Sequence, residues 1–242
     1  MFYIFREHIK QSLAVIVFLI TLTACTSESY DAGDGPNSYL TADLVLLHTS
    51  QDKSVRSALL DDGTTLQFSN PFAQDWLTRP DSVYRALLYY DKTVAASDAA
   101  ASNPTATSIV RARSVRPVSV LRPVEAEDME TLRTDPVGFE SLWMSKNKSY
   151  INLSLLLKSG KTEADDALHA LGIVSHGTTT DADRRRTLHL TLYHDQGGVP
   201  AYYTVQQYVS IPTQLLEEAD TIELTLNTYN GKKVVKVAVS NL

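Results

Sequence analysis

Cys25 is the only cysteine among the 242 residues, and it follows a stretch that has the layout of a secretory signal. The chain starts with the basic residues Arg6 and Lys10, continues with an apolar run over 13–20, and reaches Cys25 through Leu22-Thr23-Ala24. The apolar run is shorter than the roughly 20 residues that span a bilayer, and its flanks are typical of a cleaved signal. Small residues before a cysteine are what lipoprotein signal peptidase requires, so we predict a signal peptide over 1–24 and lipidation of Cys25. The alternative is an ordinary secretory signal in which Cys25 is incidental.

Lipidation at Cys25 would fix the location of the mature chain. A single acyl chain binds a membrane only marginally, whereas two or more anchor a protein stably. We therefore expect a lipid-anchored protein of the cell envelope, at the outer membrane, on its periplasmic side or at the cell surface. With no other cysteine, the mature chain would have no disulfide and no thiolate nucleophile.

Four histidines in the C-terminal half, His169, His176, His189 and His194, suggest a metal site because imidazole is a common ligand. Successive side chains of a strand point to opposite faces, so His189 and His194, five residues apart, cannot face the same ligand from one strand. We expect His189 on a solvated sheet surface, and we predict no metal site and no cofactor.

The sequence has no pattern typical of a catalytic site. It contains no G-x-S-x-G, no H-E-x-x-H and no glycine-rich phosphate loop. The pairs Asp61-Asp62 and Asp165-Asp166 lie in predicted turns, where adjacent carboxylates usually only solvate the chain. We predict no catalytic residues and no enzymatic activity. A hydrolase of envelope polymers, with its site between two domains, is the alternative.

Two basic stretches could bind an anionic ligand or protect strand edges from pairing. One is Arg184-Arg185-Arg186, and the other comprises Arg111, Arg113, Arg116 and Arg122. The formal net charge of −6 argues against a nucleic-acid surface. We expect no nucleic-acid partner.

The N-terminal half of the chain has the pattern of a small barrel. Residues 25–41 are polar and predict a flexible tether. From Ala42, about five short apolar runs separated by turn signals such as Asp61-Asp62-Gly63 predict strands. A low-complexity stretch over 93–108 predicts a loop. We therefore expect a barrel over 42–124 and a connector over 125–147.

The C-terminal part alternates apolar and polar residues with a period of two. Leucines and isoleucines recur at every second position in 150–157 and 188–192, and again in 222–226. This period predicts strands with one buried face, packed as two sheets. We expect an immunoglobulin-like β-sandwich over 148–242, and an all-β chain.

The chain resembles the NigD-like lipoproteins. The resemblance rests on the start at Cys25, on Asp135-Pro136 with Trp143, on Tyr150-Ile151-Asn152-Leu153, and on the segment from Tyr208 to Lys232. It implies an N-terminal OB-like barrel followed by a C-terminal β-sandwich. The family has no established activity, so the resemblance implies no site residues.

These observations together predict a non-enzymatic envelope lipoprotein with a binding or accessory role. The predicted partners are the membrane, through the lipid anchor, and a protein or a glycan.

Overall fold

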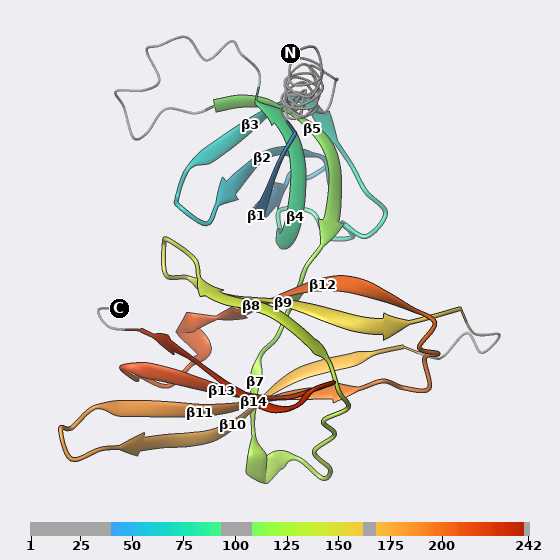
Figure 1. Cartoon of the computed structure of the whole chain (residues 1–242). Helices are drawn as coiled ribbons and strands as arrows, with labels where there is room; N and C mark the ends of the chain where they lie inside the picture. Colours follow the sequence, from blue (N-terminus) through green and yellow to red (C-terminus); the bar gives the residue numbers. More distant parts are fainter. Residues whose placement is uncertain (1–39, 93–107, 162–167, 240–242) are drawn as a thin grey trace, which may run out of the picture. The chain divides into compact units, whose positions relative to one another are not determined.

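The computed structural model describes residues 40–92, 108–161 and 168–239 (Figure 1). The predicted signal peptide over 1–24 and the lipidation of Cys25 lie outside the described residues. So do the predicted tether, apart from residues 40 and 41, and the predicted loop over 93–108, apart from Ser108. No helix in the described part of the chain is long and apolar enough to cross a membrane.

The N-terminal part is a closed barrel of five strands, which confirms the expected OB-like architecture (Figure 1). The strands are β1 (Leu40–Thr49), β2 (Val55–Leu60), β3 (Thr65–Phe72), β4 (Val83–Lys92) and β5 (Ser108–Pro117). Their order around the barrel is β1-β2-β3-β5-β4, and β1 also pairs with β4. Only β3 and β5 run parallel; the other pairs are antiparallel.

Alternate side chains of these strands fill the barrel. Val45 and Leu47 of β1, and Ala86 and Leu88 of β4, are fully buried in one hydrophobic cluster. The predicted Asp61-Asp62-Gly63 turn joins β2 to β3. Gly63 has a φ of +89°, where a side chain would be strained. The sequence therefore closes this hairpin with the residue that its backbone needs.

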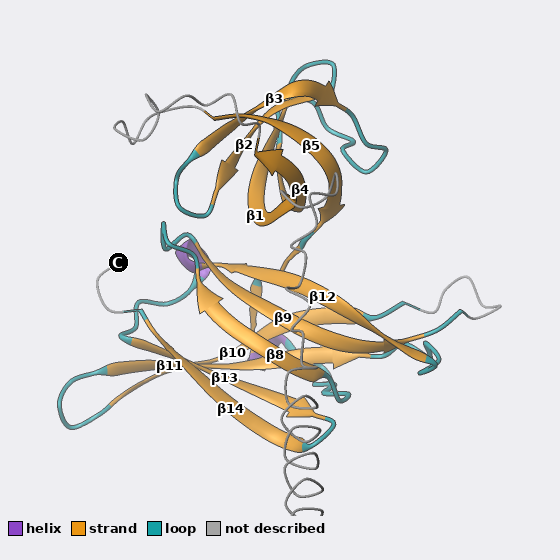
Figure 2. Ribbon diagram, turned by 45° about the horizontal axis from the view of Figure 1, so that its top comes forward, coloured by secondary structure: helices purple, strands orange, loops and turns teal. Residues whose placement is uncertain are grey.

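The C-terminal part is a sandwich of two sheets (Figure 2). Its strands are β6 (Ser119–Val120), β7 (Pro123–Glu125), β8 (Gly138–Met144), β9 (Tyr150–Ser159), β10 (Ala170–Thr180), β11 (Arg186–Asp195), β12 (Tyr203–Pro212), β13 (Thr221–Thr228) and β14 (Gly231–Ala238). One sheet has the order β14-β13-β11-β10-β7 and the other β6-β12-β9-β8. Two short 3-10 turns are present, η2 (Ala126–Asp128) and η3 (Thr213–Leu215).

The alternating leucines form the core between these sheets, as predicted. Leu153 and Leu155 of β9 face Leu190 of β11 and Leu224 of β13 within one buried cluster. The opposite face of β9 carries the polar residues Asn152 and Ser154, which are also buried. The sheet of β9 is therefore covered on both faces at this point.

The predicted connector over 125–147 differs from the structure. It contains β8, a strand that pairs with β9 along most of its length. The sandwich also begins before residue 125, because β6 pairs with β12 and β7 pairs with β10, both in parallel. Strands β6 and β7 are too short to show a period of two, and Pro117 and Pro123 interrupt the sequence around them.

Candidate binding site

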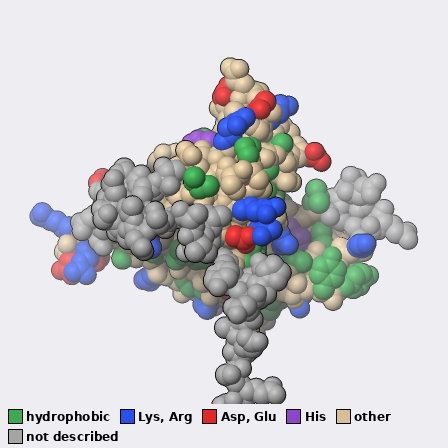
Figure 3. All heavy atoms as spheres, turned by 90° about the horizontal axis from the view of Figure 1, so that it is seen from above, with side chains coloured by type: hydrophobic (Ala, Val, Ile, Leu, Met, Phe, Trp, Pro, Cys, Tyr) green, Lys and Arg blue, Asp and Glu red, His purple; other side chains and the backbone are tan. Residues whose placement is uncertain are grey.

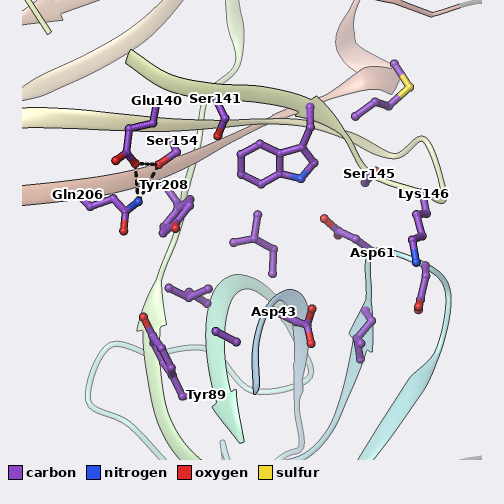
Figure 4. A pocket seen from close by; sticks show the side chains of 17 residues that line it. Asp43, Asp61, Tyr89, Glu140, Ser141, Ser145, Lys146, Ser154, Gln206 and Tyr208 are labelled. Atoms are coloured by element: carbon purple, nitrogen blue, oxygen red, sulfur yellow. Dashed lines mark hydrogen bonds between the residues drawn. The ribbon is translucent and has the colours of Figure 1, made fainter. Parts of the chain in front are cut away.

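A cavity of about 440 Å³ is lined by residues of both the barrel and the sandwich (Figure 4). The barrel contributes side chains of β1 and β4 and of the turn between β2 and β3. The sandwich contributes side chains of β8, β9 and β12. The volume of the cavity lies within the range typical of small-molecule sites.

An apolar and aromatic cluster forms part of the cavity wall. Leu44 and Leu87 of the barrel pack in one cluster with Trp143 and Tyr208 of the sandwich. The rings of Trp143 and Tyr208 meet edge to face, with centroids 6.3 Å apart and an interplanar angle of 82°. This geometry is favourable for aromatic pairs. The wall is therefore a fixed aromatic surface, to which Tyr89 of β4 adds a third ring.

A buried arginine joins the barrel to the sandwich next to the cavity. The guanidinium group of Arg85, on β4, donates two hydrogen bonds to the Asp61 carboxylate, at 2.6 and 2.7 Å. It also donates to Asn152 Oδ1 at 3.0 Å and to Ser210 Oγ at 3.1 Å. Its charged end lies 4.3 Å from the centroid of the Tyr150 ring. We call Arg85, Asp61, Asn152 and Ser210 the arginine clamp.

The members of the arginine clamp also bond to one another. Ser210 Oγ donates to Asn152 Oδ1 at 2.7 Å, and Asn152 Nδ2 donates to Asp61 Oδ2 at 3.1 Å. The Arg85 side chain is only 1% exposed. A buried charge is tolerated only when it is paired and fully hydrogen-bonded. Asp61 pairs the charge of Arg85, and Asn152 and Ser210 accept further hydrogen bonds from it. The arginine clamp therefore fixes the turn after β2 against β9 and β12.

Glu140 of β8 lies on the sandwich side of the cavity, together with Ser154 and Gln206 (Figure 4). Its Oε2 accepts hydrogen bonds from Ser154 Oγ and from Gln206 Nε2, both at 2.5 Å. The bond from Ser154, and then that from Gln206, lowers the pKa of Glu140 below its ordinary value. Glu140 is therefore a carboxylate at neutral pH.

Asp43 of β1 lies on the barrel side of the cavity (Figure 4). Its Oδ2 accepts a hydrogen bond from the hydroxyl of Tyr90, at 2.9 Å. Burial, and then the bond to Asp43, raises the pKa of Tyr90, so this phenol stays protonated as a donor. Tyr90 therefore orients the Asp43 carboxylate from within the barrel core.

Asp62 lies in the same turn as Asp61. Its carboxylate accepts a hydrogen bond from the Thr64 backbone at 2.9 Å, and this bond is the main cause that lowers the pKa of Asp62. The charge of Lys146, which also lines the cavity, lowers it further. Asp62 and Lys146 thus place opposite charges at one end of the cavity.

The histidines do not contribute to this cavity. His189 bonds to Thr179 and Glu223 on the outer face of its sheet, whereas His194 is 1% exposed, so the two face opposite sides as predicted. Within the described residues, no group of three or more histidine, cysteine or acidic side chains could hold a metal ion.

His169 and His194 form a hydrogen-bonded pair instead. His194 Nδ1 faces the carbonyl oxygen of Asp135 at 2.9 Å, so it must carry the proton that it donates. His194 Nε2 then accepts from His169 Nδ1, at 3.0 Å. His169 Nε2 is buried and has no hydrogen-bond partner in the described structure.

We expect this pair to make the fold less stable in acid. Burial, and then the neighbouring His194, lowers the pKa of His169 below 6.5 in the folded chain. As pH falls below about 6.5, the unfolded chain takes up the proton more readily, so the free energy of unfolding decreases until the folded pKa is passed. Urea unfolding at about pH 7.5 and about pH 5 measures this loss, which should be smaller in His169→Gln. An equal loss in both proteins would contradict the expectation.

The arginine stretches lie elsewhere on the surface. Arg113 pairs with Asp91 on the barrel, and Arg186 pairs with Glu218 on the sandwich at 3.4 Å. On the face shown in Figure 3, basic and acidic side chains are interspersed. The arginines of the two stretches do not line the cavity.

Sequence reasoning missed the arginine clamp and the cavity. Asp61 was expected to be a solvated turn residue, but its carboxylate binds the buried Arg85. A signal for this was present, since Arg85 interrupts the apolar run VYRALLYY of β4. A charged residue at such a position has to be paired.

Comparisons with known proteins agree with this architecture. Residues 120–239 match the family model of the NigD-like C-terminal beta sandwich domain. No curated protein matches the chain.

Several solved structures share the fold over most of the chain. A NigD-like immunity protein from Bacteroides caccae has 23% identity and a TM-score of 0.59, with 81% of this chain and 91% of that chain covered. A "Putative lipoprotein" from Bacteroides fragilis has 14% identity and a TM-score of 0.57, with coverage of 84% and 99%. A protein of unknown function from Bacteroides vulgatus has 16% identity and a TM-score of 0.56, with coverage of 82% and 90%. At these identities the likeness extends to the fold alone.

Proposed function

Since this chain belongs to the NigD-like family through the β-sandwich domain of residues 120–239, we propose that it is a non-enzymatic envelope protein that binds a ligand in the cavity between barrel and sandwich. The observation that carries this proposal is the cavity itself. Its walls combine three aromatic side chains with carboxylate, amide and hydroxyl groups. An apolar surface with a few oriented polar groups is the usual composition of a binding site.

The shifted pKa values of two cavity carboxylates do not fit the general acid of a glycosidase. A glycosidase needs one carboxyl group that stays protonated near neutral pH and acts as the general acid. Glu140 and Asp62 have lowered pKa values, which is the opposite change. Asp61 is held by Arg85 and cannot move toward a substrate. These groups are suited to accept hydrogen bonds from a ligand.

A tyrosine placed in the cavity should abolish binding. Ser141 is an exposed residue of β8 that lines the cavity, so Ser141→Tyr should fill it without disturbing the core. Ser119→Tyr, at an exposed position of β6 outside the lining, is the matched control. A panel of oligosaccharides and peptides is titrated against the purified chain by calorimetry. A ligand that binds the wild type and the control but not Ser141→Tyr supports the proposal.

Two results of the same panel would count against the proposal. One is equal binding by all three proteins, which would move the ligand away from the cavity. The other is turnover of a saccharide, ester or peptide that Ser141→Tyr abolishes, which would favour the envelope hydrolase.

We also propose that lipidated Cys25 anchors the protein to the outer membrane. The support is the Leu22-Thr23-Ala24-Cys25 sequence, and the similar structure from Bacteroides fragilis is named "Putative lipoprotein". Cells grown with a labelled fatty acid should incorporate the label into the wild type but not into Cys25→Ala. The wild type should fractionate with membranes, and the variant should be released. Membrane association of an unlabelled Cys25→Ala chain would contradict the lipid anchor.

A further inference from the structure

The charges that line the cavity do not cancel. Asp61 is neutralised by Arg85, and Asp62 has Lys146 as a neighbour of opposite charge. Asp43 and Glu140 are different, because neither forms an ion pair with any of the described residues. Their hydrogen-bond donors are the neutral groups of Tyr90, Ser154 and Gln206. Two negative charges therefore remain uncompensated by the described residues.

Each of these two carboxylates also keeps one oxygen available. Tyr90 bonds to Oδ2 of Asp43, while Ser154 and Gln206 both bond to Oε2 of Glu140. Within the described structure, Oδ1 of Asp43 and Oε1 of Glu140 accept no hydrogen bond from the protein. Asp43 comes from the barrel and Glu140 from the sandwich, so they approach the cavity from different walls (Figure 4). Each carboxylate can therefore accept a hydrogen bond from a ligand in the cavity.

The aromatic wall also favours a positively charged ligand, independently of the carboxylates. Trp143, Tyr208 and Tyr89 line the same cavity. The face of an aromatic ring attracts a cation, and tryptophan does so most strongly. Arg85 above the Tyr150 ring shows that this chain already uses such a contact in the neighbouring arginine clamp. Aromatic rings and uncompensated carboxylates together select for positive charge.

We infer that the cavity binds an organic cation, whose ammonium or guanidinium groups bind the Asp43 and Glu140 carboxylates beside the aromatic wall. This inference rests on the proposed binding function and adds the chemical class of the ligand. Such a group donates several hydrogen bonds and accepts none, which matches the acceptor oxygens that the protein leaves open. An anionic ligand would meet two like charges. Amino sugars and basic peptides are the two sources of this chemistry.

Matched ligand pairs test the charge directly. The purified chain is titrated with a disaccharide of glucosamine and with its N-acetylated counterpart, which differ in charge and acetyl substitution. It is also titrated with a short lysine- and arginine-containing peptide and with its glutamine counterpart. We expect a cationic member of one pair to bind at least about tenfold more tightly than its neutral partner. The pair that shows the difference identifies the source.

Two substitutions test the residues. Asp43→Asn and Glu140→Gln remove one charge each and retain an oxygen that can accept the internal hydrogen bonds. Each should weaken binding of the cation about tenfold. Glu127→Gln removes a charge at an exposed position of η2, outside the cavity lining, and should leave binding unchanged.

The results separate this inference from the proposed function. If a neutral or anionic ligand binds as tightly as the cation, and Ser141→Tyr still abolishes binding, the cation inference is wrong and the binding function stands. If Asp43→Asn and Glu140→Gln bind the cation as the wild type does, the assignment to these residues is wrong. If Ser141→Tyr binds every ligand as the wild type does, both proposals fail.

Discussion

Replacement of Arg85 by methionine is expected to lower the free energy of unfolding by about 3–5 kcal/mol. Methionine keeps most of the side-chain volume but removes the charge that pairs with Asp61. The substitution leaves the Asp61 carboxylate without its cation, and Asn152 and Ser210 lose hydrogen bonds in a buried site. Removal of one partner from a buried pair is costly because the other stays behind uncompensated. Urea unfolding at neutral pH measures the change.

An exposed ion pair provides the control for this experiment. Arg56 lies 3.9 Å from Asp52, and both side chains are more than 60% exposed. Arg56→Met should therefore change the free energy of unfolding by no more than about 1 kcal/mol. A loss in Arg85→Met no larger than that in Arg56→Met would contradict the role of the arginine clamp.

The arginine clamp also predicts how the two parts of the chain unfold. The barrel and the sandwich have separate hydrophobic cores, and the clamp with the small cluster around Trp143 joins them. We expect the wild type to unfold in one transition. In Arg85→Met, two transitions should appear when unfolding is followed by the far-ultraviolet signal and by tryptophan fluorescence, to which Trp76 of the barrel and Trp143 of the sandwich both contribute. Coincident transitions in the variant would show that the apolar cluster suffices.

Truncation of Leu153 to alanine is expected to cost about 2–5 kcal/mol of folding free energy. Leu153 is fully buried between the two sheets of the sandwich and lies at the centre of β9. The loss combines the transfer of the missing carbons with the cavity that they leave, since a close-packed core relaxes only partly.

The matched control for Leu153→Ala is Leu132→Ala, because Leu132 is 43% exposed outside the named strands. Its truncation should cost less than about 1 kcal/mol. Guanidinium unfolding at neutral pH compares the two variants. Similar losses in both would mean that β9 is not a central strand of the core.

The fold could be predicted from the sequence where its signals are local. The alternating leucines of β9, β11 and β13 show which face of each strand is buried, and the structure buries that face. The turn at Gly63 is a local signal of the same kind. Strands β6 and β7 have only two and three residues, and no periodicity can be detected over that length. The predicted barrel over 42–124 therefore includes β6 and the first two residues of β7, which pair within the sandwich.

The candidate site was much harder to predict. Trp143 is part of the pattern that carries the family resemblance, and the structure places it in one cluster with Leu44 and Leu87 of the barrel. Glu140 and Asp43 gave no sequence signal at all. A single carboxylate on a strand looks the same whether it faces bulk water or a cavity, and the difference depends on what lies opposite.

The sequence by itself therefore determined the all-β class and the buried faces of β9, β11 and β13, because these depend on residues two positions apart. The tertiary structure alone decided that Arg85 meets Asp61, Asn152 and Ser210, which are 24, 67 and 125 residues away in the chain. It decided in the same way that Asp43 and Glu140 share one cavity. Contacts over such separations require the barrel to be closed and the sheets to be paired. No local pattern specifies them, because each partner is chosen by the packing of strands that are remote in sequence.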